Sequence, residues 1–323
     1  MKMIINYGIM MKKEIIMPFL IIGIVVFIYL ILCFVVYMII FFSRYKKDKD
    51  IYNIPSSPQY AKHHDLMIKL IDEFKGENYE DVYIKTFDGK RLHARYYKVS
   101  DDNIVDICFH GYRGTAIRDF CGGRKISYIT KHNLLVVDQR GHGLSQGHHL
   151  TFGAKESKDV KYWIDYVNER FNNDVKIFLY GVSMGASTVL MTSDMNYKNV
   201  KAIIADSPYT SGADIIRKVC NVDIKIPWFF VRHIIYLSAF IFGCFRLSKA
   251  NVIKHVENAN VPIMIIHSED DKFIPVDMSR KIYDCNKEHI RLITFKDAGH
   301  GISYLEDNER YEKEVISFIK ANE

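Results

Sequence analysis

The stretch VKIFLYGVSMGASTVLMTSDM, residues 175–195, decides the fold of this chain. An apolar run rich in strand-forming residues leads directly into the motif GVSMG at residues 181–185, and small, helix-forming residues follow it. A serine on such a sharp strand-to-helix turn has its hydroxyl exposed above the sheet, and the two glycines leave room for the adjacent strand and helix. The stretch therefore predicts a nucleophile elbow with Ser183 as the nucleophile. The alternative is a glycine-rich turn with an inert serine.

A candidate acid lies in VPIMIIHSEDDKFIP, residues 261–275. This segment begins as a proline-led apolar strand and ends in a cluster of acidic side chains. The cluster comes just past the carboxyl end of a strand, where open α/β sheets place their reactive groups. We select Asp271 as the acid, with Asp270 and Glu269 as its competitors.

A candidate base lies in LITFKDAGHGIS, residues 292–303, where a further strand gives way to a loop of small residues with His300 between two glycines. A serine hydroxyl is a poor nucleophile at neutral pH, so we expect His300 to accept the proton of Ser183. Asp271 would hold the imidazole in the correct tautomer and stabilise the imidazolium that forms. The alternative for His300, one of 13 histidines, is a surface residue with no part in the chemistry.

The segment NIVDICFHGYRG, residues 103–114, is an apolar strand that ends in His110 and Gly111. Glycine at this position allows the following backbone N–H to turn toward the nucleophile. We therefore predict an oxyanion hole formed by the backbone N–H groups of Tyr112 and Met184. The alternative is a turn that needs glycine only for its own geometry.

The motifs GVSMG, HGYRG, DQRGHGLSQG, IHSEDDKFIP and DAGHGIS occur in the order found in the α/β-hydrolase superfamily. From about Tyr79 onward the chain resembles bacterial membrane-anchored members of that superfamily, often labelled serine aminopeptidase-like or cell-surface hydrolases. The resemblance implies Ser183 as nucleophile, Asp271 as acid and His300 as base, with no metal and no organic cofactor.

The resemblance also assigns a structural role to the loop DQRGHGLSQG, residues 138–147. Its glycines would turn the chain, and Arg140 is expected to bond backbone carbonyls. Asp138 and His142 precede the nucleophile in the chain, which is against the hydrolase order of serine, acid and base.

Elsewhere, apolar strands alternate with helix-forming segments, which predicts an α/β-hydrolase fold with a mostly parallel central sheet and helices on both faces. A hairpin is expected around Asp88 and Gly89, and helices are expected over residues 61–74 and 154–171. The strands are expected near Val105, Leu134, Ile177, Ile203, Met264 and Leu292.

Residues 15–42 form an uncharged apolar run that is long enough to cross a hydrocarbon core of about 30 Å. We expect a single-pass transmembrane anchor here, preceded by a tail over residues 1–14 and followed by a linker over residues 43–60 that separates it from the hydrolase domain at 61–323. A cleaved signal peptide is the alternative, but its apolar region is usually about 7 to 15 residues long. Basic residues flank both ends of the run, so the side of the membrane that holds the domain stays undetermined.

An insertion at residues 211–250 corresponds to the cap of related hydrolases, and its second half, residues 226–247, is rich in large apolar side chains. We expect these side chains to cover the active site and favour apolar acyl groups. The bilayer surface, a sheet edge or the packing of the cap itself are the alternatives. A second membrane span is rejected because it would separate the acid and base from Ser183.

The net charge of +6 does not indicate a nucleic-acid partner, because residues 1–50 carry seven Lys or Arg against three Asp or Glu. The basic cluster from Arg44 to Lys49 is interpreted as a membrane-flanking charge.

We expect a serine hydrolase that cleaves a carboxylic ester, or a related amide or thioester, of a small acyl substrate. The alternatives are a serine peptidase acting on short peptides and a catalytically silent binding protein with the same fold.

Overall fold

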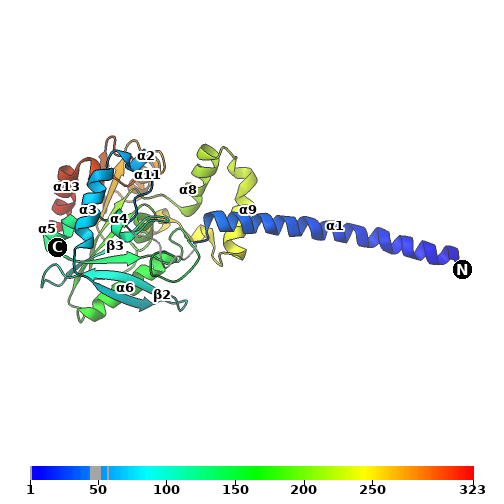
Figure 1. Cartoon of the computed structure of the whole chain (residues 1–323), viewed down its shortest axis with the longest axis horizontal. Helices are drawn as coiled ribbons and strands as arrows, with labels where there is room; N and C mark the ends of the chain where they lie inside the picture. Colours follow the sequence, from blue (N-terminus) through cyan, green and yellow to red (C-terminus); the bar gives the residue numbers. More distant parts are fainter. Residues whose placement is uncertain (1, 44–51, 57) are drawn as a thin grey trace.

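The computed structural model describes residues 2–43, 52–56 and 58–323 (Figure 1). The basic cluster from Arg44 to Lys49, with half of the predicted linker, lies outside these ranges.

The described chain contains one eight-stranded sheet, in the order β1-β2-β4-β3-β5-β6-β7-β8. β1 pairs antiparallel with β2, and β2 pairs antiparallel with β4, whereas the other neighbours are parallel. This arrangement confirms the predicted fold class, and each predicted strand centre lies inside a strand. The strands are β1 (Glu80–Lys85), β2 (Arg91–Tyr97), β3 (Ile104–Phe109), β4 (Asn133–Asp138), β5 (Lys176–Val182), β6 (Val200–Asp206), β7 (Ile263–Ser268) and β8 (Ile290–Phe295).

Helices cover both faces of the sheet, as the continuous apolar character of its central strands requires. Successive residues of a strand point to opposite faces, so Ile107 of β3 packs in one core and Cys108 in the other. The first core is covered by α6 (Glu156–Arg170), α10 (Val252–Val256) and α11 (Asp277–Cys285). The second core is covered by α3 (His64–Lys75), α5 (Arg124–Thr130) and α13 (Asn308–Lys320).

The insertion at 211–250 is helical, as predicted. It contains α8 (Gly212–Lys218), a π-helical turn (Val219–Asp223), α9 (Trp228–Ile241) and a 3-10 turn (Leu247–Lys249). Figure 1 shows that α8 and α9 extend from the body of the domain on the side from which the N-terminal helix leaves it.

The N-terminal helix α1 runs from Lys2 to Ile40, so residues 2–14, predicted as a tail, belong to the same helix as the apolar run. Its segment Ile16–Ile40 is long and apolar enough to cross a membrane, which fits an anchor or a signal sequence. Residues 16–32 are mostly exposed and project from the domain (Figure 1).

The last turns of α1 pack against the domain, which differs from the expectation that a linker separates them. Phe41 is fully buried, with its ring against the rings of Phe152 and Phe245 at centroid distances of 5.9 and 5.3 Å. The backbone N–H of Leu150 donates to the Phe41 carbonyl at 2.8 Å. Two ring contacts and one backbone hydrogen bond therefore stabilise this arrangement. The charges and prolines from which the linker was predicted carry no information about these contacts.

Candidate active site

Ser183 occupies a strained turn between β5 and α7 (Met184–Leu190), with φ 56° and ψ −114°. Residues with side chains rarely adopt this region, and such strain persists only where the surrounding structure imposes it. A Cβ on Gly181 would lie 2.3 Å from the Gly185 carbonyl carbon, and a Cβ on Gly185 would lie 1.8 Å from the Phe109 carbonyl oxygen. The two glycines of the motif therefore permit the close approach that forms the turn.

The structure brings Ser183, His300 and Asp271 into one hydrogen-bonded series. The Ser183 hydroxyl lies 2.9 Å from His300 Nε2, and His300 Nδ1 lies 2.7 Å from Asp271 Oδ2. The arrangement fits an imidazole that donates its Nδ1–H to Asp271 and accepts the Ser183 hydroxyl proton at Nε2. The ring of Phe273 meets the His300 ring edge to face at 5.0 Å and limits its movement.

Asp271 has a buried side chain held by several donors. The backbone N–H groups of Phe273 and Ile274 both donate to its Oδ1 at 2.8 Å, and His267 Nε2 lies 3.2 Å from its Oδ2. Burial acts to raise the pKa of Asp271, but the hydrogen bonds and charges of His267 and His300 outweigh burial and hold its pKa well below the usual range. Asp271 is therefore a carboxylate at neutral pH.

The two competing carboxylates make other contacts. Asp270 Oδ1 accepts hydrogen bonds from the Ser268 hydroxyl and, at 3.1 Å, from the backbone N–H of Gly299. Glu269 forms an ion pair with Arg280 at the surface. Asp270 therefore supports the loop that carries His300 but does not bond the imidazole.

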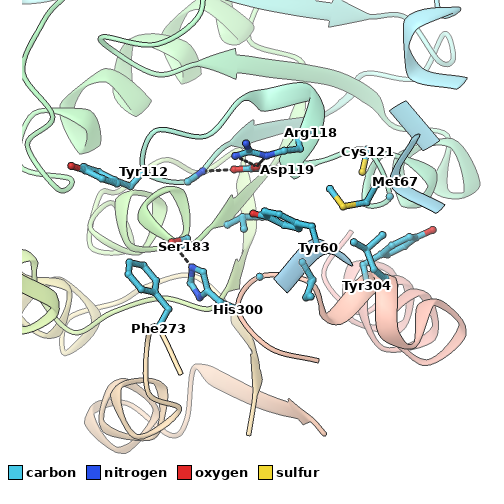
Figure 2. A pocket seen from close by; sticks show the side chains of 17 residues that line it. Tyr60, Met67, Tyr112, Arg118, Asp119, Cys121, Ser183, Phe273, His300 and Tyr304 are labelled. Atoms are coloured by element: carbon cyan, nitrogen blue, oxygen red, sulfur yellow. Dashed lines mark hydrogen bonds and ion pairs between the residues drawn. The ribbon is translucent and has the colours of Figure 1, made fainter. Parts of the chain in front are cut away.

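The backbone N–H groups of Tyr112 and Met184 remain the predicted donors of the oxyanion hole. Met184 is the first residue of α7, so its N–H lacks an intrahelical acceptor. A Cβ on Gly111 would lie 3.3 Å from the Ser183 Cβ, so glycine allows this loop to reach the nucleophile. Figure 2 shows the phenol of Tyr112 directed away from Ser183.

Sequence reasoning missed the acidic residue that fixes this loop. Asp119, in α4 (Ala116–Asp119), accepts the N–H of Gly111 at 2.8 Å through Oδ2 and binds Arg118 through Oδ1 at 2.9 Å. No motif marks Asp119 in the sequence. Asp119 lies eight residues after Gly111, and the two come into contact only because the chain turns back between them.

Sequence reasoning also missed a hydrogen-bonded group, Ser207, Asp206 and Tyr311, that supports the loop carrying His300. The Ser207 hydroxyl donates to Asp206 Oδ1 at 2.8 Å and accepts the backbone N–H of Gly301 at 3.2 Å. Tyr311 donates its phenol hydrogen to Asp206 Oδ2 at 3.1 Å. Burial raises the pKa of Asp206, although these hydrogen bonds oppose the shift.

A pocket lies beside Ser183. Its lining includes Gly111 to Tyr112, Arg118 to Asp119, Phe273, and His300 to Leu305 (Figure 2). Tyr60 of α2 (Pro58–Ala61) also lines it. None of the described lining residues belongs to residues 211–250, so the insertion does not line this pocket as the predicted cap would. Its apolar side chains pack with the end of α1 and with Phe152 and Tyr209 of the domain, or are exposed.

Arg140 has a different role from the predicted one. Its guanidinium bonds both carboxylate oxygens of Asp159 at 2.6 Å and also Asp88 at 3.1 Å, so it binds carboxylates rather than backbone carbonyls. The loop at 138–147 is structural, as expected: Asp138 bonds His93, and His142 accepts the backbone N–H of Arg113.

Among residues 2–43, 52–56 and 58–323, no group of three or more His, Cys, Asp or Glu side chains is arranged to hold a metal ion. The arrangement provides a hydroxyl beside an imidazole and a buried carboxylate. These groups suit nucleophilic attack on a carbonyl carbon followed by stabilisation of an oxyanion.

A family model described as serine aminopeptidase, S33, matches residues 130–234. This range includes the turn with Ser183 but ends before Asp271 and His300. YqkD from Bacillus subtilis (strain 168) is 24% identical over 188 residues, which cover 58% of this chain and 62% of YqkD. The match therefore spans less than two thirds of that relative. YfhR from Escherichia coli (strain K12) is 26% identical over 248 residues, which cover 74% of this chain and 80% of YfhR.

Among solved structures, an esterase from Pyrococcus furiosus, Pf2001, aligns with a TM-score of 0.63 and 23% identity. The alignment covers 77% of this chain and 93% of the esterase. A likeness at this level of identity shows the fold.

Proposed function

Because this chain belongs to the α/β-hydrolase superfamily, we propose that it is a serine hydrolase that cleaves carboxylic esters through an acyl-Ser183 intermediate. The single observation that carries the proposal is the series of hydrogen bonds from Ser183 through His300 to Asp271, beside an open pocket. A binding protein would have no need for this series, since the strained turn at Ser183 costs folding free energy.

The first half of the proposed reaction forms the acyl-enzyme. Ser183 Oγ attacks the ester carbonyl carbon while His300 Nε2 takes the hydroxyl proton. The developing oxyanion accepts hydrogen bonds from the N–H groups of Tyr112 and Met184, each worth roughly 3 to 4 kcal/mol in comparable enzymes. When the C–O bond breaks, His300 returns the proton to the leaving alkoxide.

The second half releases the acid. A water molecule gives a proton to His300 Nε2 and attacks the acyl carbon, after which the proton passes back to Ser183 Oγ. Asp271 stays ionised throughout, because its hydrogen bonds favour the carboxylate. Its negative charge stabilises the imidazolium that exists in both halves.

The charges in the pocket favour an ester over the amino end of a peptide. An aminopeptidase must bind an ammonium group, which calls for an unengaged carboxylate near the nucleophile. Among the described residues that line the pocket, the only carboxylate is Asp119, and Arg118 and the Gly111 N–H already engage it. The pocket also presents apolar side chains, which supports an apolar acyl or alkyl group: Met67, Val182, Phe273, Ile302 and Leu305.

We further propose that α1 anchors the enzyme in a lipid bilayer through residues 15–42. Its exposed apolar side chains support an anchor, because a helix of this kind is not stable in water. The catalytic groups lie in the domain beyond it, on a side of the membrane that the sequence leaves open.

Substrate assays on the full-length protein in detergent micelles test the proposal. We expect hydrolysis of p-nitrophenyl esters, with kcat/KM rising several-fold per added carbon until the pocket is full. Amino-acid p-nitroanilides should be poor substrates, and Ser183→Ala should hydrolyse neither class. Preferential cleavage of the anilides, or an active Ser183→Ala protein, would overturn the ester assignment.

A further inference from the structure

The helix α9 is apolar on its exposed face as well as on its buried face. Ile235, Ser238 and Ala239 are buried on the inner side of the helix, which packs on α1. On the outer side, Phe229, Phe230 and Phe240 are 66%, 70% and 58% exposed. A surface helix of a soluble domain places polar side chains on its outer face.

The exposed face continues into the turn that precedes α9. Val222, Ile224 and Ile226 are all exposed there, and Ile241 is exposed at the other end of the helix. Contiguous apolar surface of this kind marks an interaction site. No described part of the chain covers it.

The segment at the end of α9 contacts α1 near Phe34 and Tyr37. The ring of Phe242, which follows α9, lies 5.2 Å from the ring of Phe34 and 6.0 Å from that of Tyr37. Cys33 is fully buried in the same region. Figure 1 shows α9 crossing α1 close to the body of the domain, while the rest of α1 projects freely.

The length of α1 allows us to estimate how deep in a bilayer its contact with α9 would lie. A hydrocarbon core of about 30 Å corresponds to about 20 helical residues at 1.5 Å per residue. Counted from Ile16, where the apolar span begins, the core ends near Val35. Phe34 and Tyr37 flank this position, so α9 crosses α1 at the boundary between acyl chains and headgroups.

The composition of the insertion fits that boundary. Residues 211–250 hold six Lys or Arg against two Asp and no Glu. Lys225, Arg232 and Arg246 are exposed, where they could bind anionic headgroups. Trp228 and Tyr236 belong to the residue types that are enriched at membrane–water interfaces.

We propose that α9 and the turn before it, residues 222–241, form an interfacial lipid-binding surface that lies in the headgroup region of an anionic bilayer beside α1. The proposal rests on the proposed membrane anchor and adds a second, independent membrane contact to it. The insertion also reaches the pocket rim, because Lys218 Nζ donates to the Lys272 carbonyl at 2.6 Å and lies above the Phe273 ring. Docking of α9 therefore holds one edge of the active-site pocket close to the lipid surface.

The two tryptophans of the chain allow a direct test on the full-length protein. Trp228 is at the start of α9, whereas Trp163 belongs to α6 and is fully buried in the core. The variants Trp163→Phe and Trp228→Phe each retain one of them. Both are reconstituted in vesicles of phosphatidylcholine and phosphatidylglycerol that contain a lipid with a nitroxide near its carbonyl groups.

We expect Trp228 to lose roughly half of its fluorescence to the shallow nitroxide and less to a nitroxide at the chain end, because an interfacial helix is buried only about 5 to 10 Å deep. Trp163 should lose little with either lipid. Vesicle flotation confirms that each variant is bound. An unquenched Trp228 in a vesicle-bound protein would overturn the proposal and indicate that water or another protein covers α9.

Two substitutions that introduce negative charge on the exposed face of α9 test whether this face contacts lipid. In the Trp163→Phe protein, Phe229→Glu with Phe230→Glu should reduce the quenching of Trp228 at least twofold, because carboxylates resist burial beside anionic headgroups. Ile129→Glu, at an exposed apolar position on α5, is the matched control and should leave it unchanged. Equal quenching in both proteins would overturn the proposal. Quenching requires no catalysis, so this result is independent of whether Ser183 is a nucleophile.

Discussion

The phenol of Tyr112 donates a hydrogen bond to the backbone carbonyl of Ile40 at 2.7 Å. Arg113 donates through Nη2 to the carbonyl of Ile39 at 2.7 Å. Carbonyls in the last turn of a helix have no intrahelical donor, so these two side chains cap α1. Both residues directly follow Gly111 in the loop that carries a proposed oxyanion donor. The end of the proposed anchor is therefore bonded to the active-site loop.

Tyr112→Phe separates the two roles of this residue. It retains the backbone N–H but removes the bond to Ile40, so we expect the free energy of unfolding to fall by about 1 kcal/mol. The kcat should fall less than tenfold, because the amide and not the phenol contacts the oxyanion. Tyr83→Phe, at an exposed position on β1, serves as the control in both assays. A loss of kcat above a hundredfold with unchanged stability would place the phenol in the chemistry.

The packing of α1 predicts where the chain can be shortened. Removing residues 1–32 deletes only the projecting part, so the remaining protein should be soluble, folded and active on short esters. Removing residues 1–42 also deletes Cys33, Tyr37 and Phe41, all buried. The loss of Phe41 alone should cost roughly 3 to 5 kcal/mol. We expect the second truncation to melt at a clearly lower temperature; equal melting temperatures would contradict the observed packing.

Asp271→Asn should reduce kcat on the order of 10⁴-fold, because an amide at this position favours the wrong imidazole tautomer. Asp270→Asn should cost far less, since Asp270 bonds only Ser268 and the Gly299 N–H. Glu269→Gln controls for loss of a nearby charge. Steady-state kinetics on one ester ranks the three variants, and a reversed order of Asp271 and Asp270 would refute the assignment of the acid.

His93 should make stability depend on pH. It is buried between Asp138 at 2.7 Å and Asp81 at 2.8 Å. Burial alone would lower the pKa of His93, but the two carboxylates raise it above its usual value. A raised folded-state pKa gives stability that is fully present below about pH 6.5 and is lost as the pH rises through the folded value.

Thermal unfolding between pH 6 and pH 9 measures this effect. The wild-type melting temperature should fall over this range by more than that of His93→Gln, which carries no titrating ring. The comparison between the two proteins removes the contribution of His132, whose pKa is also raised. Parallel curves for the two proteins would contradict the prediction.

The features of this molecule that could be predicted from the sequence are those encoded by short segments of the chain. The glycines around Ser183, the strand ends before Asp271 and His300, and the hairpin at Asp88 are each specified within about ten residues. The strand order and the sheet confirm that reading of the fold. The contacts among Ser183, His300 and Asp271 follow from the rule that reactive loops meet at one edge of a parallel sheet.

Other features depend on contacts between distant segments and are not visible in the sequence. Arg140 binds Asp159 and Asp88, which lie 19 and 52 residues away. The apolar insertion was expected above the pocket because apolar side chains must be covered, but composition does not say by what. The structure places these side chains beside α1, where the chain's other large apolar surface lies.

The central claim is that Ser183 is the nucleophile, and covalent labelling tests it most directly. The full-length protein is treated with a fluorophosphonate, digested and mapped by mass spectrometry. We predict one adduct, on the peptide that contains Ser183, with no labelling of Ser183→Ala and strongly slowed labelling of His300→Ala. An adduct on another residue, or equal labelling of Ser183→Ala and the wild-type protein, would contradict the account.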